Sequence, residues 1–141
     1  MARRIVPEFG PCDSVLFLAL WWRGDRVCTL VDVIWLYDWV DRSIPTAEIL
    51  DSGLNRLLAA GLVAERRGGF FIPAKVLREF NLFRRRRRRN RFEMAEEFVQ
   101  SAGPLEAVPR RVMIRRADQQ RAYDEYQRRF QAACKKATGG A

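Results

Sequence analysis

An unbroken run of arginines near the middle of the chain limits the possible folds more than any other feature of the sequence. It comprises Arg84, Arg85, Arg86, Arg87, Arg88 and Arg89, and after Asn90 the chain adds Arg91. On a helix these side chains would point in every direction, so the segment has no apolar face with which to enter a core. Burial is excluded because each unpaired guanidinium would cost several kcal/mol. The like charges also repel one another along a helix, so acidic side chains or an anionic partner must offset them.

The distribution of charge places any attraction to a polyanion in the second half of the chain. Residues 1–74 contain 8 Arg and 9 Asp or Glu, whereas residues 75–141 contain 18 Lys or Arg and 8 Asp or Glu, within a formal net charge of +9. Because arginine forks onto phosphate and stacks on planar groups, the run suits RNA as well as DNA. Contact with about six phosphates would give a log–log salt dependence with a slope of about −5. The alternative is a solvated helix whose charge is partly offset by Glu79, Glu93, Glu96 and Glu97.

Apolar residues at helical spacing predict three helices in the first half. The first covers residues 13–22 with Asp13 or Ser14 as its N-cap, and the second covers residues 30–40 after Thr29. The third runs from its cap, Thr46, to residue 60, where a glycine ends it. Four leucines would form its buried face: Leu50, Leu54, Leu57 and Leu58.

A short β-hairpin is predicted directly after the third helix. Residues 62–66 and 70–73 are expected to be strands, and the turn from Arg67 to Gly69 joins them because glycines supply the positive φ angles of tight hairpins. The predicted fold class is therefore mainly α with a small β-hairpin (α+β).

This order of elements resembles winged helix-turn-helix proteins. The element Leu54-x-x-Leu57-x-x-x-Gly61-Leu62-Val63 carries the resemblance. Residues 15–73, somewhat under half of the chain, also resemble a group of small, uncharacterised bacterial winged-helix proteins. The resemblance implies a winged helix-turn-helix domain with a short N-terminal arm over residues 1–74, followed by an arginine-rich helical extension over residues 75–141.

In winged-helix proteins the third helix reads DNA, and the resemblance implies that role here. Its outward positions would be Asp51, Ser52, Asn55, Arg56 and Ala59. Ser52, Asn55 and Arg56 would supply whatever base preference exists, since such side chains can bond to base edges in the major groove. Glu48 and Asp51 would repel phosphate. The alternative interpretation is therefore that the helix only completes the core or contacts another protein.

Two further arginines, Arg66 and Arg67, lie near the tip of the predicted wing. Wings of this fold often touch phosphates or the minor groove. Solvated arginines on a hairpin are equally ordinary, so both interpretations stand.

The second half is predicted to be helical on both sides of the arginine run. One helix from about residue 74 to residue 100 is expected, because Arg and Glu are good helix formers. Gly103 and Pro104 end it, residues 111–115 are expected to form a short strand, and residues 117–135 form the last helix. The aromatic face of that helix would pack on the long helix or form a two-fold homodimer. It consists of Tyr123, Tyr126 and Phe130.

Several aromatic residues of the first two helices allow two interpretations. They are Trp21, Trp22, Trp35, Tyr37 and Trp39. They could form a stacking platform, but their helical spacing favours core or dimer contacts.

The composition argues against catalytic, metal and cofactor chemistry. The chain has no His, and none of its three cysteines lies within four residues of another. It has neither a glycine-rich phosphate loop nor a G-x-S-x-G motif, so no catalytic residue, metal or cofactor is expected. The apolar stretch Val15–Trp22 falls short of the about 20 residues of a membrane-spanning helix. The scattered cysteines fit a reducing cytoplasm.

The sequence thus predicts a cytoplasmic nucleic-acid-binding protein, with DNA favoured and RNA left open. Transcriptional regulation is the role that the resemblance suggests. The alternative is a non-catalytic protein–protein interaction module, in which the winged helix and the basic extension dock an acidic partner or a second subunit. The near-neutral third helix favours this alternative more than a simple regulator would.

Overall fold

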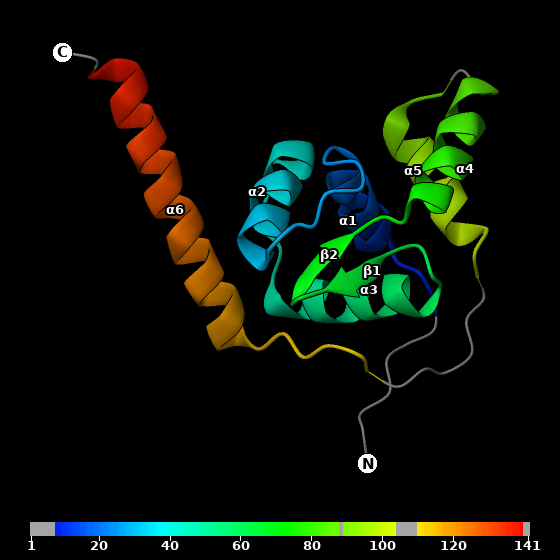
Figure 1. The fold of residues 1–141 in the computed structure, drawn as a ribbon, viewed down its shortest axis with the longest axis horizontal. Coiled ribbons are helices and arrows are strands. Elements are labelled where there is room, and N and C mark those ends of the chain that lie inside the picture. The colour runs from blue at the N-terminus through cyan, green and yellow to red at the C-terminus, as the bar shows by residue number, and fades with distance from the viewer. Residues whose placement is uncertain (1–7, 88, 104–109, 140–141) are drawn as a thin grey trace.

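The computed structural model describes residues 8–87, 89–103 and 110–139 of the 141 residues. The described residues form helices α1 (Pro11–Trp21), α2 (Leu30–Asp41), α3 (Ala47–Ala59), α4 (Ala74–Arg85), α5 (Arg91–Gln100) and α6 (Arg116–Thr138), with strands β1 (Ala64–Arg66) and β2 (Gly69–Phe71) between α3 and α4. Figure 1 shows α4 and α5 on one side of the first three helices and α6 on the other. The prediction of a mainly helical chain with one small antiparallel hairpin is confirmed.

Local sequence fixes the starts of the first three helices. The hydroxyl of Thr29 accepts a hydrogen bond from Asp32 N at 3.3 Å, and that of Thr46 accepts one from Ile49 N at 3.1 Å, as predicted. The predicted start of α1 is wrong, because the helix begins at Pro11. Asp13 lies in its first turn, where its carboxylate accepts the N–H of Gly10 at 3.1 Å.

The core surrounds α1, whose residues 16–20 are all buried. Phe17 lies 5.2 Å from Phe80 of α4 and 5.6 Å from Phe98 of α5, measured between ring centroids. Residues beyond 74 therefore share one core with α1–α3, rather than forming a second core of their own. Burial of these rings accounts for the packing of α4 and α5 against the first half.

The expected single helix over residues 74–100 is wrong, since α4 ends at Arg85 and α5 begins at Arg91. Asn90 caps α5 by accepting the N–H of Phe92 at 2.7 Å. A break lets Phe80 and Phe98 approach to 5.1 Å across the two helices. It also relieves the repulsion that a continuous helix would impose on consecutive arginines.

The hairpin forms as predicted, with Ala64 opposite Phe71 and Arg66 opposite Gly69. The two turn residues with positive φ are Arg67 (52°) and Gly68 (76°), whereas Gly69 already belongs to β2. Cys28, between α1 and α2, adds an isolated bridge to β2: its N–H donates to Phe70 O at 2.7 Å, and it accepts Phe70 N–H at 2.8 Å. Burial raises the pKa of the Cys28 thiol to about 11.

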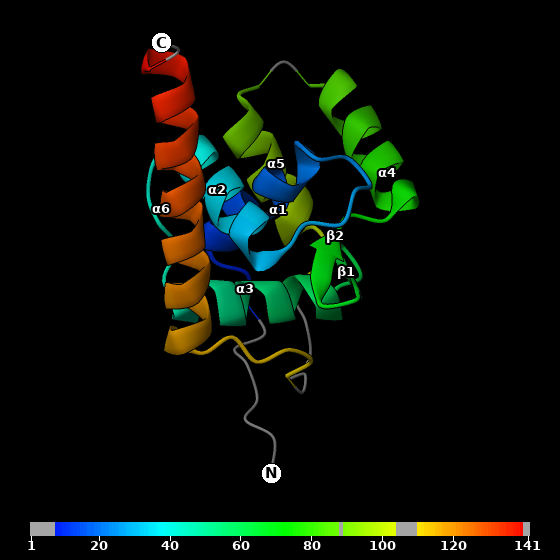
Figure 2. The same ribbon diagram turned by 60° about the vertical axis from the view of Figure 1, so that its left-hand side comes forward.

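The expected strand over residues 111–115 is absent, and the described segment 110–115 is extended without a strand partner. The helix that follows, α6, is confirmed. It packs along α2, as Figures 1 and 2 show. From Gln127 to Gly139 every side chain is exposed, so the second part of α6 projects beyond the core. None of the helices that the structure describes has the length and apolar character needed to cross a membrane.

Candidate nucleic-acid interface

The face of α3 that was expected to point outward is covered. Asn55 is fully buried, with 0% of its surface exposed, and Asp51 is also buried. The prediction that Asn55 faces solvent to contact base edges is therefore wrong. The reason lies far along the chain, because the segment 110–114 packs over this face of the helix.

Asn55 and Asp51 bind that segment through its backbone. The Asn55 amide donates to Asp51 O at 2.7 Å and to Val112 O at 3.0 Å, and its carbonyl accepts the N–H groups of Arg111 at 2.6 Å and Val112 at 3.0 Å. Asp51 accepts the Ile114 N–H at 2.8 Å. These side chains satisfy the backbone groups that a neighbouring strand would otherwise satisfy, which explains an extended segment without a sheet.

Arg56 is engaged inside the molecule. Its Nε lies 2.6 Å from Asp13 Oδ2 and its Nη2 lies 2.9 Å from Asp13 Oδ1, a two-point pair in which Asp13 is fully buried. The expected outward placement of Arg56 is therefore wrong as well. The pair joins α1 to α3 where Gly53 allows the helices to approach, since a Cβ there would meet Leu16 and lie 2.9 Å from Asp13.

The remaining predicted contacts on this side are few. Ser52 is half-buried on α3, and Arg66 and Arg67 are exposed at the hairpin tip. The Arg66 guanidinium lies over the Phe71 ring, 5.4 Å from its centroid. The structure thus leaves α3 and the hairpin with two exposed cations, which is little for binding a phosphate backbone.

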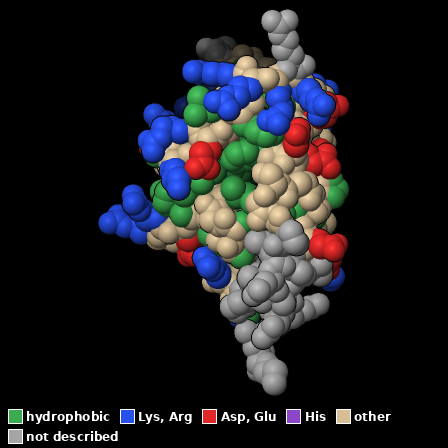
Figure 3. Space-filling model, turned by 90° about the vertical axis from the view of Figure 1, so that its right-hand side faces the viewer, with side chains coloured by type: hydrophobic (Ala, Val, Ile, Leu, Met, Phe, Trp, Pro, Cys, Tyr) green, Lys and Arg blue, Asp and Glu red, His purple; other side chains and the backbone are tan. Residues whose placement is uncertain are grey.

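The arginine corner is the turn between α4 and α5, and we define it by Arg84–Arg87, Arg89 and Arg91. The predicted site residue Arg88 lies outside the described residues. Arg87 and Arg89 share one carboxylate, that of Glu97, at 3.6 and 3.4 Å. Within the described ranges Arg85 and Arg86 are exposed and make no ion pair. Figure 3 shows this side of the molecule, with Lys and Arg side chains around an apolar centre.

Aromatic rings alternate with guanidinium groups at this corner. Arg84 lies 4.4 Å from the ring centroid of Trp21, Trp21 lies 5.3 Å from Trp22, and Arg91 lies 5.0 Å from Trp22. Arg87 similarly covers Phe83 at 3.9 Å. Such cation–π contacts are favourable and leave the N–H groups at the guanidinium edges able to bind anions.

The sequence interpretation assigned these tryptophans to the core or to a dimer contact, and the structure divides the aromatic set. Tyr37 is buried, whereas Trp22 is 46% exposed, Trp35 38% and Trp39 69%. The sequence gives one sign that Trp22 is exposed: it lies at the end of the first predicted helix, which was expected to stop at Gly24. Its partner Arg91 is distant in sequence, so their pairing had no local signal.

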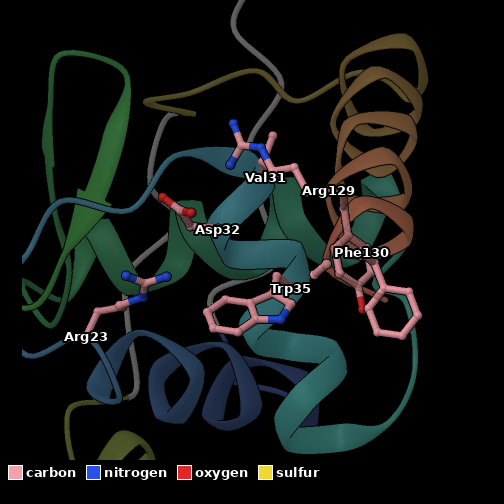
Figure 4. A pocket seen from close by; sticks show the side chains of 8 residues that line it. Arg23, Val31, Asp32, Trp35, Arg129 and Phe130 are labelled. Carbon is pink, nitrogen blue, oxygen red and sulfur yellow. The ribbon is translucent and has the colours of Figure 1, made fainter. Parts of the chain in front are cut away.

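A second exposed aromatic surface lies between α2 and α6. A cavity of about 300 Å³ is lined by Trp35 and Phe130 and by the charged residues Arg23, Asp32 and Arg129. Figure 4 shows Trp35 from α2 and Phe130 from α6 at this cavity. In the contact between α2 and α6, the Tyr126 hydroxyl donates to Asp38 at 2.6 Å. Burial of the Tyr126 side chain, and to a lesser extent the neighbouring Asp38 carboxylate, raises the pKa of Tyr126 to about 12.

Within the described parts of the chain, no three His, Cys, Asp or Glu side chains are arranged to bind a metal ion. No protein-family model, curated protein or solved structure matches the chain.

Proposed function

We propose that this chain is a nucleic-acid-binding protein that holds phosphates with its arginine corner. The observation that carries the proposal is the exposure of Arg85 and Arg86 at a turn where Glu97 already serves Arg87 and Arg89. Where cations outnumber the neighbouring carboxylates, they attract a polyanion and release its counterions.

We further propose that the first half is a winged helix. The order α1, the bridge at Cys28, α2, α3 and the hairpin supports this proposal, with β1 and β2 as the wing. The three free cysteines support a cytoplasmic location, where thiols stay reduced. Transcriptional regulation would follow if the bound nucleic acid is promoter DNA.

In this proposal α3 supports the fold and does not read bases. Asn55 is buried, and Arg56 is paired with buried Asp13, so Ser52 is the predicted reader on this helix that is neither buried nor held in an ion pair. Because phosphate contacts carry no sequence information, we expect binding that tolerates many sequences.

The test measures binding of a fluorescein-labelled oligonucleotide by anisotropy from about 50 to about 300 mM salt, a range over which counterion release changes the affinity. The variant Arg85→Gln/Arg86→Gln/Arg89→Gln spares Arg84 and Arg87, which stack on partly buried rings. We expect the magnitude of the log–log slope to fall by about 2 to 3, since each lost phosphate contact removes about 0.7 to 0.9.

The matched control removes the same number of charges from the opposite side of the molecule. Arg121→Gln/Arg128→Gln/Arg129→Gln lies on α6, where these residues pair with Asp118 and Glu125. We expect its slope to change by less than about 1. Absence of binding at low salt, or equal losses in both variants, would overturn the proposal.

A second candidate function is favoured by the α2–α6 surface. We propose that Trp35, Trp39 and Phe130 bind a second copy of the chain. Trp39 is 69% and Phe130 56% exposed, which is unusual for such large rings in a monomer. The lining carries both signs of charge, so the surface can complement its own copy across a two-fold axis.

Sedimentation velocity tests this candidate. We expect the wild-type chain to sediment as a dimer and Trp39→Ser/Phe130→Ser to sediment as a monomer, because the substitutions remove the central apolar contact. Leu82→Ser, which alters an exposed apolar residue on α4, is the control and should stay dimeric. A monomeric wild type at about 100 μM, well above the Kd of specific assemblies, contradicts the candidate.

A further inference from the structure

We infer that the arginine corner takes single-stranded rather than double-stranded nucleic acid, with one base stacked on Trp22. This inference rests on the proposed function and names the form of its ligand. It is carried by the alternating row Arg91, Trp22, Trp21 and Arg84, in which consecutive groups lie 5.0, 5.3 and 4.4 Å apart.

Trp22 has the properties of a stacking platform. Nearly half of it is exposed, at 46%, and the planar guanidinium of Arg91 lies over its ring. A nucleobase is planar in the same way and can occupy that position, since bases stack on aromatic rings whatever their sequence. Arg91 is exposed and can then turn its N–H groups toward the adjoining phosphate.

The platform is held in place before any ligand binds. Trp21, whose ring lies tilted against that of Trp22, donates its indole N–H to Asn81 Oδ1 at 3.1 Å and meets the buried Phe80 edge-on at 6.1 Å. Three helix ends meet here: Trp22 follows α1, Arg84 lies in the last turn of α4, and Arg91 begins α5. A rigid support lowers the ordering cost of binding.

The geometry disfavours a duplex. In a duplex the faces of the bases are stacked on one another, so a protein reaches base edges and phosphates but not ring faces. The arginine segment is also not a straight helix that could enter a major groove, because it is interrupted between Arg85 and Arg91. The face of α3 that would enter the groove is covered by the segment 110–114.

Phosphates of a single strand have exposed cations beside the platform. Among the residues described, Arg85 and Arg86 are exposed and have no carboxylate partner, and Arg91, which also has none, lies on Trp22 itself. A base on the ring with phosphates on either side is the arrangement that binds single strands with little sequence preference.

The experiment compares 12-nucleotide oligo(dT), oligo(U) and a 12-base-pair duplex over the same salt series, using the full chain and the variants Trp22→Ala and Trp22→Leu. The leucine variant keeps an apolar contact with Trp21, so it guards against a loss of folding. Met113→Ala removes a comparably exposed apolar side chain, 56% exposed, outside both the arginine corner and the α2–α6 surface, and is the matched control.

We expect both oligonucleotides to bind more tightly than the duplex, and both Trp22 variants to weaken single-strand binding about 10- to 100-fold. Their salt slope should stay that of the wild type, because no charge is lost. A preference for oligo(U) or oligo(dT) would identify RNA or DNA as the source of the strand and supports the inference equally.

Duplex binding as tight as single-strand binding would overturn the inference, as would unchanged affinity in both Trp22 variants. In either case an intact dependence on Arg85, Arg86 and Arg89 leaves the proposed function standing. Failure to bind any of the three ligands at low salt overturns both.

Discussion

Replacing Arg56 by leucine is expected to destabilise the protein by about 3–5 kcal/mol, the largest stability loss of any single substitution considered. The change removes the two-point partner of Asp13, which is fully buried and keeps the Gly10 N–H as a donor. A buried carboxylate without its cation is no longer compensated for the free-energy cost of leaving water. Urea unfolding followed by circular dichroism measures the loss.

A double-mutant cycle tests the reason for that loss. Asp13→Asn/Arg56→Leu leaves no buried charge and is expected to be more stable than Arg56→Leu alone, so the two substitutions couple. Arg78→Leu, on the exposed side of α4, is the control and should change the free energy of unfolding by less than about 0.5 kcal/mol. A loss below about 1 kcal/mol for Arg56→Leu contradicts the buried pair.

Replacing Asn55 by alanine is expected to cost about 3 kcal/mol of folding stability. The substitution leaves the N–H groups of Arg111 and Val112 and the carbonyl of Val112 without their partner, and each buried unsatisfied group costs about 1–3 kcal/mol. Opening of the segment to water limits the total. The same unfolding assay gives the loss, with Ser52→Ala on the same helix as a control expected to lie near zero.

The segment 110–114 supplies a second readout for Asn55. Once its anchor is removed, we expect trypsin to cleave after Arg110 or Arg111 faster than in the native chain, because local opening exposes the backbone. Native-like resistance to trypsin together with native stability would show that the side chain does not hold the segment. Both substitutions at α3 therefore test the fold, although the sequence presented these residues as readers of DNA.

The predictions that were confirmed depend on neighbouring residues. Thr29 and Thr46 cap the helices that they were expected to cap, and a hairpin turn forms where it was expected, with positive φ at Gly68 and, in place of the second glycine, at Arg67. These features arise from hydrogen bonds and backbone angles within a few residues, so a sequence pattern contains all of the information needed. The helix α6 was likewise recognisable from its own periodicity.

The candidate site was harder to predict because its contacts join distant parts of the chain. Asn55 and Val112 are 57 positions apart, and Arg56 and Asp13 are 43 apart. An amphipathic pattern identifies the apolar face of α3, but a polar face looks the same whether water or another segment covers it. The sequence could therefore propose Asn55 and Arg56 as exposed readers without any sign of their burial.

For the arginine run, the sequence by itself determined that consecutive arginines cannot form part of a core, because unpaired guanidinium groups are too costly to bury. Only the tertiary structure decided what surrounds them. The break between Arg85 and Arg91 lets Phe80 pack against Phe98, and it brings Arg91 over Trp22. Charge is a property of residue identity, whereas the arrangement of rings and guanidinium groups depends on how the helices fill the core.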